Sequence, residues 1–331
     1  MNRTLEQQSL SLTSGSSRID QAEAAAVSLR SVVQKRSRFR LGPLTLDIPA
    51  GYITAIVGTN GSGKSSTFRL LMGQSRADEG ELWMLEEQVG SGIDDTKLKQ
   101  RVGYVPEEDN KSDAPLRGTF KAGFVSEWYP DWNGSEFERL LREFEVEPSM
   151  RLGKMSKGMR RKYELSLALA HGPELLLLDE PSSGLDPLSW RKMVDELHRY
   201  MRRGPRTILM ATHILEEVKR LADYIAIMAN GRIIGMYEKD ELLSSWHTFY
   251  VGPVAAAETA DSTSAVPLLV RDVEELPGLV DAEEAGGGTC RVTTSKAWEA
   301  EQWCRREGLP VTGQRPLELD EIMALLIRDS Y

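Results

Sequence analysis

Short apolar runs separated by amphipathic stretches dominate the middle of the chain. Residues 44–58 hold two β-type runs separated by a Pro-Ala-Gly turn, and the second run is apolar enough for a buried central strand. The stretch 136–146 has the clearest helical pattern, with apolar residues three and four positions apart. Strands that alternate with helices predict an α/β fold with a mainly parallel sheet. Three further apolar runs read as buried strands of that sheet: 174–180, 206–213 and 224–234.

Changes in composition divide the chain into four parts. Residues 1–26 are rich in Ser, Gln and Ala and predict a disordered or weakly ordered tail, with structure starting near Val32. Residues 27–246 form the main α/β domain. Its stretch from Asp78 to His171 has a more helical pattern, and a helical subdomain is expected at about 107–170. Residues 247–266 resemble a linker, and 267–331 predict a small α+β unit with a turn at its three consecutive glycines and a closing helix.

Composition and charge exclude several classes of protein. A chain of 331 residues, 40% of them apolar, is long enough for one sizeable core and a smaller appended unit. The net charge of −9 argues against nucleic acid as a main partner. The two cysteines are too few for a disulfide framework, which favours a reducing cytoplasm. No apolar stretch approaches the roughly 20 residues that span a bilayer, so a second chain must cross any membrane at which this protein works.

The strongest chemical motif directly follows the first buried strand. "GTNGSGKSS" fits the phosphate-binding pattern G-x-x-x-x-G-K-[ST] in a strand-loop-helix context. Glycines let backbone N–H groups surround phosphate oxygens, and the following helix directs its positive end at the same anion. Lys64 is expected to reach the β- and γ-phosphates, and Ser65 to ligate Mg²⁺. The predicted phosphate loop consists of Gly58, Thr59, Asn60, Gly61, Ser62, Gly63, Lys64, Ser65 and Ser66.

A second motif, "LLLLDE", supplies the acidic groups that the phosphate loop lacks. Asp179 ends the leucine run and is expected to hold Mg²⁺, while Glu180 is expected to polarise the attacking water. Because successive side chains of a strand point in opposite directions, the two acids cannot be equivalent metal ligands. A pair of acids that only stabilises the start of the next helix is the alternative. Together the two motifs indicate a nucleotide triphosphatase.

With these motifs in order, the chain resembles the ATP-binding subunit of an ABC transporter from roughly Val32 to Tyr237. The resemblance implies a P-loop nucleotide triphosphatase with a helical signature subdomain. In "SSGLDP", Asp186 resembles the residue that crosses the dimer interface, and His213 resembles the switch histidine that contacts the γ-phosphate. Residues 102–108, "VGYVPEE", resemble the coupling loop between nucleotide and membrane partner. The signature turn, which the family offers to the ATP of a second chain, falls at Met155–Met159, "MSKGM".

Two positions depart from the family pattern. The signature turn keeps Ser156 and Gly158 but has lost a glycine and a glutamine. A hydroxyl and free N–H groups at a helix N-terminus remain, and these can bind an anion. The coupling loop carries Glu107 in place of the usual glutamine; a carboxylate still ligates Mg²⁺ or water, but its charge predicts slower hydrolysis. This combination resembles the branch of the family that pairs with exporter-type permeases.

Three further regions of the sequence each allow two interpretations. The family's adenine-stacking aromatic would fall near Lys35, and the nearest aromatic, Phe39, reads equally well as a packed strand residue. The aromatic segment 116–132 could dock a permease helix or form the core of the helical subdomain. The closing helix in 317–328 resembles a C-terminal helix of export-type ATPases and reads as regulatory or dimer-supporting.

The resemblance implies an ATPase that binds ATP and Mg²⁺, dimerises head-to-tail with an identical or different ATP-binding chain, and drives a separate transmembrane permease from the cytoplasmic face of the membrane. Ser156 and Gly158 would then touch the γ-phosphate of the partner's ATP. Two alternatives are a soluble ABC-type ATPase acting on ribosomes or DNA, and a nucleotide-dependent regulatory switch. The first would carry a basic face, a coiled coil or two nucleotide domains, and the second would lack Glu180 or His213.

Overall fold

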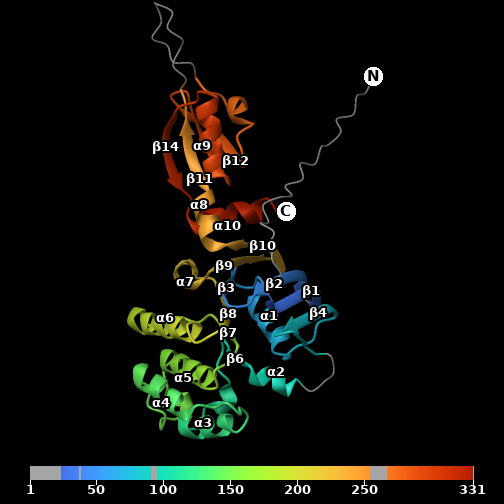
Figure 1. Ribbon diagram of the computed structural model, residues 1–331, viewed down its shortest axis with the longest axis vertical. Helices are drawn as coiled ribbons and strands as arrows, with labels where there is room; N and C mark the ends of the chain where they lie inside the picture. Colours follow the sequence, from blue (N-terminus) through green and yellow to red (C-terminus); the bar gives the residue numbers. More distant parts are fainter. Residues whose placement is uncertain (1–23, 37–38, 91–94, 254–266, 331) are drawn as a thin grey trace, which may run out of the picture.

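The computed structural model describes residues 24–36, 39–90, 95–253 and 267–330. In these ranges the chain forms three β-sheets, with a layer of helices at one end of the molecule and the C-terminal sheet at the opposite end (Figure 1). Among the helices of these ranges, none is long and apolar enough to cross a bilayer.

The central sheet has the strand order β10-β9-β3-β8-β7-β6. Its strands from β9 to β6 are parallel, and β10 joins the edge antiparallel to β9. Every residue of β3, β7 and β8 is buried, as expected for strands covered on both faces. The predicted α/β class and mainly parallel sheet are therefore confirmed. The strands are β3 (Ile53–Val57), β6 (Val102–Val105), β7 (Leu175–Asp179), β8 (Thr207–Thr212), β9 (Tyr224–Ala229) and β10 (Arg232–Glu238).

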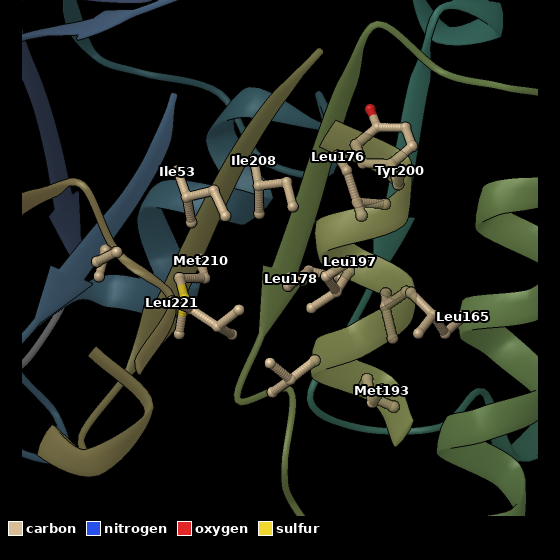
Figure 2. Close-up of a cluster of buried hydrophobic side chains, with 14 of the residues drawn as sticks. Ile53, Leu165, Leu176, Leu178, Met193, Leu197, Tyr200, Ile208, Met210 and Leu221 are labelled. Atoms are coloured by element: carbon tan, nitrogen blue, oxygen red, sulfur yellow. The ribbon is translucent and has the colours of Figure 1, made fainter. Parts of the chain in front are cut away.

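The leucines of β7 supply hydrophobic cores on both faces of this sheet. Leu176 and Leu178 belong to the core shared with α5 (Lys157–Ala170) and α6 (Pro187–Met201), where Leu178 lies beside Leu197 (Figure 2). Leu175 and Leu177 belong to the core shared with α1 (Lys64–Leu71) and a second sheet. The two-residue alternation of a strand thus distributes one apolar run between two cores.

The second sheet, of order β2-β1-β4-β5, corrects the predicted start of the domain. β1 begins at Ala25, inside the stretch expected to be a tail and well before Val32; residues 1–23 lie outside the described ranges. β4 and β6 lie within Asp78–His171, which had been predicted as more helical. Register shifts interrupt the pairing of β1 and so disturb its two-residue pattern. The strands are β1 (Ala25–Arg36), β2 (Phe39–Pro49), β4 (Glu79–Met84) and β5 (Glu87–Gln88).

Residues 224–234, predicted as one strand, form the hairpin β9-β10 instead. Asn230 and Gly231 connect the two strands with φ values of 47° and 76°. An Asn-Gly pair with positive φ at both positions is the favoured two-residue hairpin turn. The continuous apolar character of the run hid this turn.

The helical layer follows β6 in the chain and ends with α5 at Ala170. It contains α3, α4 and α5, with two 3₁₀ turns. The Asn133 side chain caps α4 by accepting a hydrogen bond from the Glu136 backbone N–H. The elements are α2 (Thr96–Gln100), just before β6, then η1 (Lys111–Asp113), α3 (Gly118–Ser126), α4 (Gly134–Glu143) and η2 (Leu152–Lys154).

The C-terminal unit begins earlier than the sequence predicted. β11 (His247–Val251) pairs with β13 and β14, so the first residues of the expected linker 247–266 are a central strand of the third sheet; 254–266 lie outside the described ranges. The order of this antiparallel sheet is β12-β13-β11-β14. The remaining elements are α7 (Leu215–Leu221), α8 (Lys239–Ser245), η3 (Val270–Val273), β12 (Leu279–Gly286), β13 (Thr289–Thr294), α9 (Ala297–Arg306), β14 (Val311–Pro316) and α10 (Leu319–Arg328).

Candidate functional site

The phosphate loop connects the buried strand β3 to helix α1. Gly58 and Gly63 are buried, while Thr59, Asn60 and Gly61 form an exposed tip. A Cβ at Gly58 would lie 2.1 Å from the Met228 carbonyl oxygen, and Gly63 has φ 118°. Both positions therefore require glycine. Glycine at these positions brings the backbone N–H groups at the start of α1 to the sheet edge, where an anion can bind.

Lys64, the first residue of α1, is only 5% exposed and points back into the loop. Its ammonium donates hydrogen bonds to the carbonyl oxygens of Gly58 at 2.7 Å and Thr59 at 3.3 Å. The Glu180 carboxylate lies 3.6 Å away. The loop also contains Ser62, whose buried hydroxyl has no hydrogen-bond partner among the described residues. A lysine held inside a glycine loop beside an unsatisfied hydroxyl fits a bound phosphate.

Ser65 and Asp179 meet across the site. The Ser65 hydroxyl donates to the Asp179 carboxylate at 3.1 Å, although the two residues are 114 positions apart in the chain. Hydroxyl and carboxylate oxygens are the ligands that Mg²⁺ prefers, and Mg²⁺ usually takes one or two protein ligands together with phosphate and water. In the described residues no group of three or more His, Cys, Asp or Glu side chains could hold a metal on its own. Ser65 and Asp179 therefore suit a Mg²⁺ ion that binds together with a nucleotide.

The electrostatics around Asp179 favour a cation at the same place. Burial raises the pKa of Asp179 to about 6, and the nearby charges of Glu107 and Glu180 act in the same direction. The side chain is 2% exposed, so its charged form is poorly hydrated. A divalent cation beside Asp179 would offset both the burial and the like charges.

Glu180 and His213 form a hydrogen-bonded pair next to Lys64. Glu180 follows β7 directly with φ 49°, a left-handed conformation that is rare outside glycine, and its N–H donates to the Ala211 carbonyl of β8 at 2.8 Å. The His213 Nδ1 lies 2.8 Å from the Glu180 carboxylate. Since an ionised carboxylate only accepts hydrogen bonds, Nδ1 is the donor. Asp179 thus faces Ser65 while Glu180 faces Lys64 and His213, as the strand alternation predicts.

Glu107 lies at the exposed end of the coupling loop, just beyond β6. Its charge reaches Asp179, because it contributes to the raised pKa of that carboxyl. The carbonyl oxygens of Pro106 and Glu107 accept hydrogen bonds from Arg161 of α5 at 2.5 and 3.0 Å. Arg161 is a functional candidate that the sequence did not reveal, because it lies in a basic stretch, 160–162, with nothing to distinguish it from its neighbours.

The residues of the signature turn make contacts within their own layer of this chain. Ser156 is the N-cap of α5 and accepts from the Met159 N–H at 3.2 Å. Gly158 packs so closely on Gly184 that a Cβ would lie 2.5 Å from the Gly184 carbonyl oxygen. Asp186 caps α6 by accepting from the backbone of Leu188 and Ser189, and the Ser189 hydroxyl leads the hydrogen bonds that lower the pKa of Asp186 to about 2. Ser156 and Asp186 therefore cap their own helices and Gly158 packs on the loop before α6, and none of the three joins the cluster around Lys64.

Phe39 and the aromatic segment 116–132, which the sequence left open, lie in different environments. The Phe39 ring packs partly buried against the second core and lies against Gly63, while the Lys35 ammonium pairs with Glu79 at 2.6 Å. In the segment 116–132, Phe120, Phe124 and Trp128 are 64%, 61% and 57% exposed. Tyr129 instead stacks on His171, and Trp132 packs against Phe137. The aromatic segment thus contributes both to the surface and to packing within the helical layer.

The fold and this edge of the sheet define the class of protein, a P-loop nucleotide triphosphatase, and comparison with known proteins identifies the family. A family profile described as ABC transporter matches residues 41–183. The chain is 32% identical over 222 residues to the Nod factor export ATP-binding protein I of Burkholderia lata, covering 64% of this chain and 71% of that protein. It is 32% identical over 210 residues to the protein of the same name in Bradyrhizobium diazoefficiens, covering 60% and 66%.

Solved structures agree with this family. The structure of an ATP-binding subunit of an ABC transporter is similar with a TM-score of 0.60 at 26% identity, covering 66% of this chain and 92% of that one. A dimeric ATP-binding cassette bound to ADP and Pi has a TM-score of 0.57 at 22% identity, covering 64% and 98%, and supports the fold. The chain belongs to the ATP-binding proteins of ABC transporters and is an ATPase.

Proposed function

We propose that this chain dimerises head-to-tail around two MgATP and drives a separate transmembrane permease from the cytoplasmic face of the membrane. The observation that carries the proposal is the convergence of Lys64, Ser65, Asp179 and Glu180 at one edge of the central sheet. Catalysis of phosphoryl transfer consists mainly of positioning and charge stabilisation, and this edge supplies groups for both.

Each residue of the cluster has a distinct role in hydrolysis. Backbone N–H groups from Gly58 to Ser66 and the Lys64 ammonium would hold the phosphates. Ser65, Asp179 and Glu107 would hold Mg²⁺, which when bound neutralises charge on the β- and γ-phosphate oxygens. Glu180 would accept the proton of the attacking water, and His213, hydrogen-bonded to it, would orient Glu180 and contact the γ-phosphate.

The second side of each ATP site would come from the partner chain. Ser156 and Gly158 stand at the start of α5, where the first N–H groups of a 14-residue helix can bind an anion. Asp186 stands at the start of α6 and is expected to cross the interface. Because these groups bind within their own layer in one chain, a second copy or a related chain is needed to complete the site.

The permease would dock on α3. Phe120 and Phe124 lie four residues apart and therefore share one side of this helix, and the ring of Trp128, in the turn just after the helix, lies 6.3 Å from that of Phe124. Exposed aromatics so arranged are typical anchors of a protein interface. The relatives named for Nod factor export favour an exporter, although the transported molecule is a property of the permease.

The C-terminal unit is proposed to regulate the ATPase or support its dimer. Leu319 and Ile322 of α10 are fully buried, with Trp246 and Leu317 beside them, in the core that the central sheet shares with α5 and α6. Lys219 of α7 is ion-paired with Glu318 at the start of α10. The unit therefore contacts α7, the helix that begins two residues after His213.

Measuring ATP hydrolysis by the purified chain, alone and with the permease co-purified from native membranes, tests the proposal. Hydrolysis that rises when the permease is present supports it. Equal hydrolysis with no co-purifying membrane protein would favour a soluble ATPase. Nucleotide binding without hydrolysis under both conditions would favour a regulatory switch.

A further inference from the structure

The two arginines of the basic stretch 160–162 are buried, and all three residues of the stretch contact other elements. Arg160 and Arg161 are 3% and 4% exposed. Arg161 donates to the carbonyl oxygens of Pro106 and Glu107, as described above, and the Lys162 ammonium lies 3.5 Å from the Ser189 hydroxyl of α6. Charged side chains are rarely buried without a specific partner. These residues therefore act as connectors rather than as a solvated face.

Arg160 takes part in a closed ring of four alternating charges. Its guanidinium lies 3.1 Å from Asp113 and 2.7 Å from Glu164, and Lys121 completes the ring at 2.7 Å from Asp113 and 2.9 Å from Glu164. The ring joins η1, α3 and α5, and each member is less than a fifth exposed. It therefore fastens η1, which follows the coupling loop in the chain, and the proposed docking helix α3 to α5.

Arg161 fastens the C-terminal end of the coupling loop itself. A guanidinium presents parallel N–H groups in a rigid fork, so two successive carbonyl oxygens hold it in one orientation and are themselves held. The backbone on both sides of the Pro106–Glu107 peptide bond is thereby tied to α5.

We propose that Arg161 is a positioning residue that locks Glu107 toward the Mg²⁺ of its own site and joins the coupling loop rigidly to the helix that begins at Ser156. The inference rests on the proposed roles of Glu107 and Ser156. It adds that one helix links the two ATP sites, because α5 offers Ser156 to the partner's nucleotide and Arg161 to its own chain's loop. Movement of the loop at one site would then move the signature turn at the other.

The test is a Mg²⁺ titration of ATP retention in the full chain carrying Glu180→Gln, which should bind nucleotide without hydrolysing it. Adding Arg161→Gln should raise the Mg²⁺ concentration for half-maximal retention about ten-fold, a typical cost of losing a residue that orients a metal ligand. Arg161→Lys, a milder change that keeps the charge but not the fork, should raise it less. Backbone amides of 105–110 should exchange faster with deuterium in both variants.

The matched control is Arg139→Gln. Arg139 ties α4 to α6 through Glu196 at 2.6 Å and also pairs with Glu136, so its loss removes ion pairs of the same layer without touching the coupling loop. It should leave the Mg²⁺ requirement within two-fold of the parent. Equal Mg²⁺ requirements for Arg139→Gln and both Arg161 variants would overturn the inference.

A fourth variant separates this inference from the proposed function. If Glu107→Ala raises the Mg²⁺ requirement and the Arg161 variants do not, only the positioning role of Arg161 fails. If Glu107→Ala changes nothing, the assignment of Glu107 as a ligand fails and this inference fails with it. If Glu107→Ala and Arg161→Gln raise the requirement together, both are supported.

Discussion

The carboxyl edge of the central sheet and the helical layer both carry residues expected to touch nucleotide, but only the first is complete within one chain. At the sheet edge, Ser65 contacts Asp179, and Glu180 contacts both Lys64 and His213. In the helical layer, Ser156 binds its own helix, and three aromatic side chains of α3 and the turn after it are exposed.

This difference follows from how the two regions are built. Parallel strands end at a common edge, so residues far apart in sequence meet there without help from another chain. A helix displays its N-terminus and one face, and each needs something placed against it to act. The sheet edge thus provides the chemistry, and the helical layer provides the surfaces through which other chains would control it.

The largest expected effect is the loss of ATP hydrolysis when the sheet edge is altered. Glu180→Gln keeps the shape of the side chain but removes the base, so hydrolysis should fall about 10³-fold while ATP binding persists. ATP-dependent dimers should then accumulate, as measured on a sizing column. Glu216→Gln, an exposed change on α7, serves as the control and should hydrolyse normally. Near-normal turnover by Glu180→Gln would remove Glu180 from the reaction.

The next prediction tests whether Ser156 of the helical layer acts on the ATP bound to a second chain. Lys64→Ala should abolish ATP binding in its own site, and Ser156→Glu should place a negative charge against the γ-phosphate of the partner's ATP. Each homodimer should be inactive. A one-to-one mixture should recover roughly a quarter of wild-type hydrolysis, since half of the randomly formed dimers are mixed and each has one intact site.

The mixture is assayed with the permease present, and mixed dimers are verified by two different affinity tags. No recovery in verified mixed dimers would mean that the two sites must act together or that Ser156 does not act across the interface. Activity in the Lys64→Ala homodimer alone would contradict a shared site outright.

The sequence predicted the sheet edge better than the helical layer for a physical reason. "GTNGSGKSS" and "LLLLDE" are continuous motifs, and the strand context alone places Ser65 and Asp179 at the same edge. The prediction that Asp179 and Glu180 are not equivalent needed only the alternation of a strand, and the different partners of the two acids agree with it.

Features that depend on distant partners were missed. β1 pairs with β2 and β4 through an irregular register, which no local pattern reveals. The charge ring joins Asp113, Lys121, Arg160 and Glu164, and each of these reads in sequence as an ordinary surface charge. Likewise β11 was assigned to a linker because its pairing partners lie 39 or more residues downstream.

A third prediction concerns the outward-facing aromatics. Phe124→Asp or Trp128→Asp should weaken permease binding by about 2 kcal/mol or more, a typical loss for an aromatic anchor, while ATP binding is unchanged. Because both side chains are more than half exposed, the free energy of unfolding should change by less than about 0.5 kcal/mol. Trp298→Asp on α9, 71% exposed, is the matched control for co-purification. Unfolding of the Phe124 or Trp128 variant would show that the residue is part of the core.

The smallest expected effect is on the pH dependence of stability. One buried titrating group from the helical layer and one from the sheet edge should change stability in opposite directions. Burial lowers the pKa of His171, at the end of α5, from 6.5 to about 4, and its ring stacks on Tyr129 at 3.9 Å. The unfolded chain therefore binds more protons than the native chain between pH 6.5 and 4, and stability is lost as pH falls. Through His171, the free energy of unfolding should therefore fall by about 2 kcal/mol when the pH is lowered from 7 to 5.

Asp179 should act with the opposite sign. Its native pKa is raised from 3.8 to about 6, so the native chain binds more protons in that range, and acidification from pH 7 to pH 5 should stabilise the metal-free protein by about 1 kcal/mol through this group. Urea unfolding with a chelator present, at both pH values, measures the two contributions. His171→Phe, which keeps a ring against Tyr129, should reduce the acid loss of stability, and Asp179→Asn should increase it. A change of the same sign in both variants would contradict the assigned environments of the two groups.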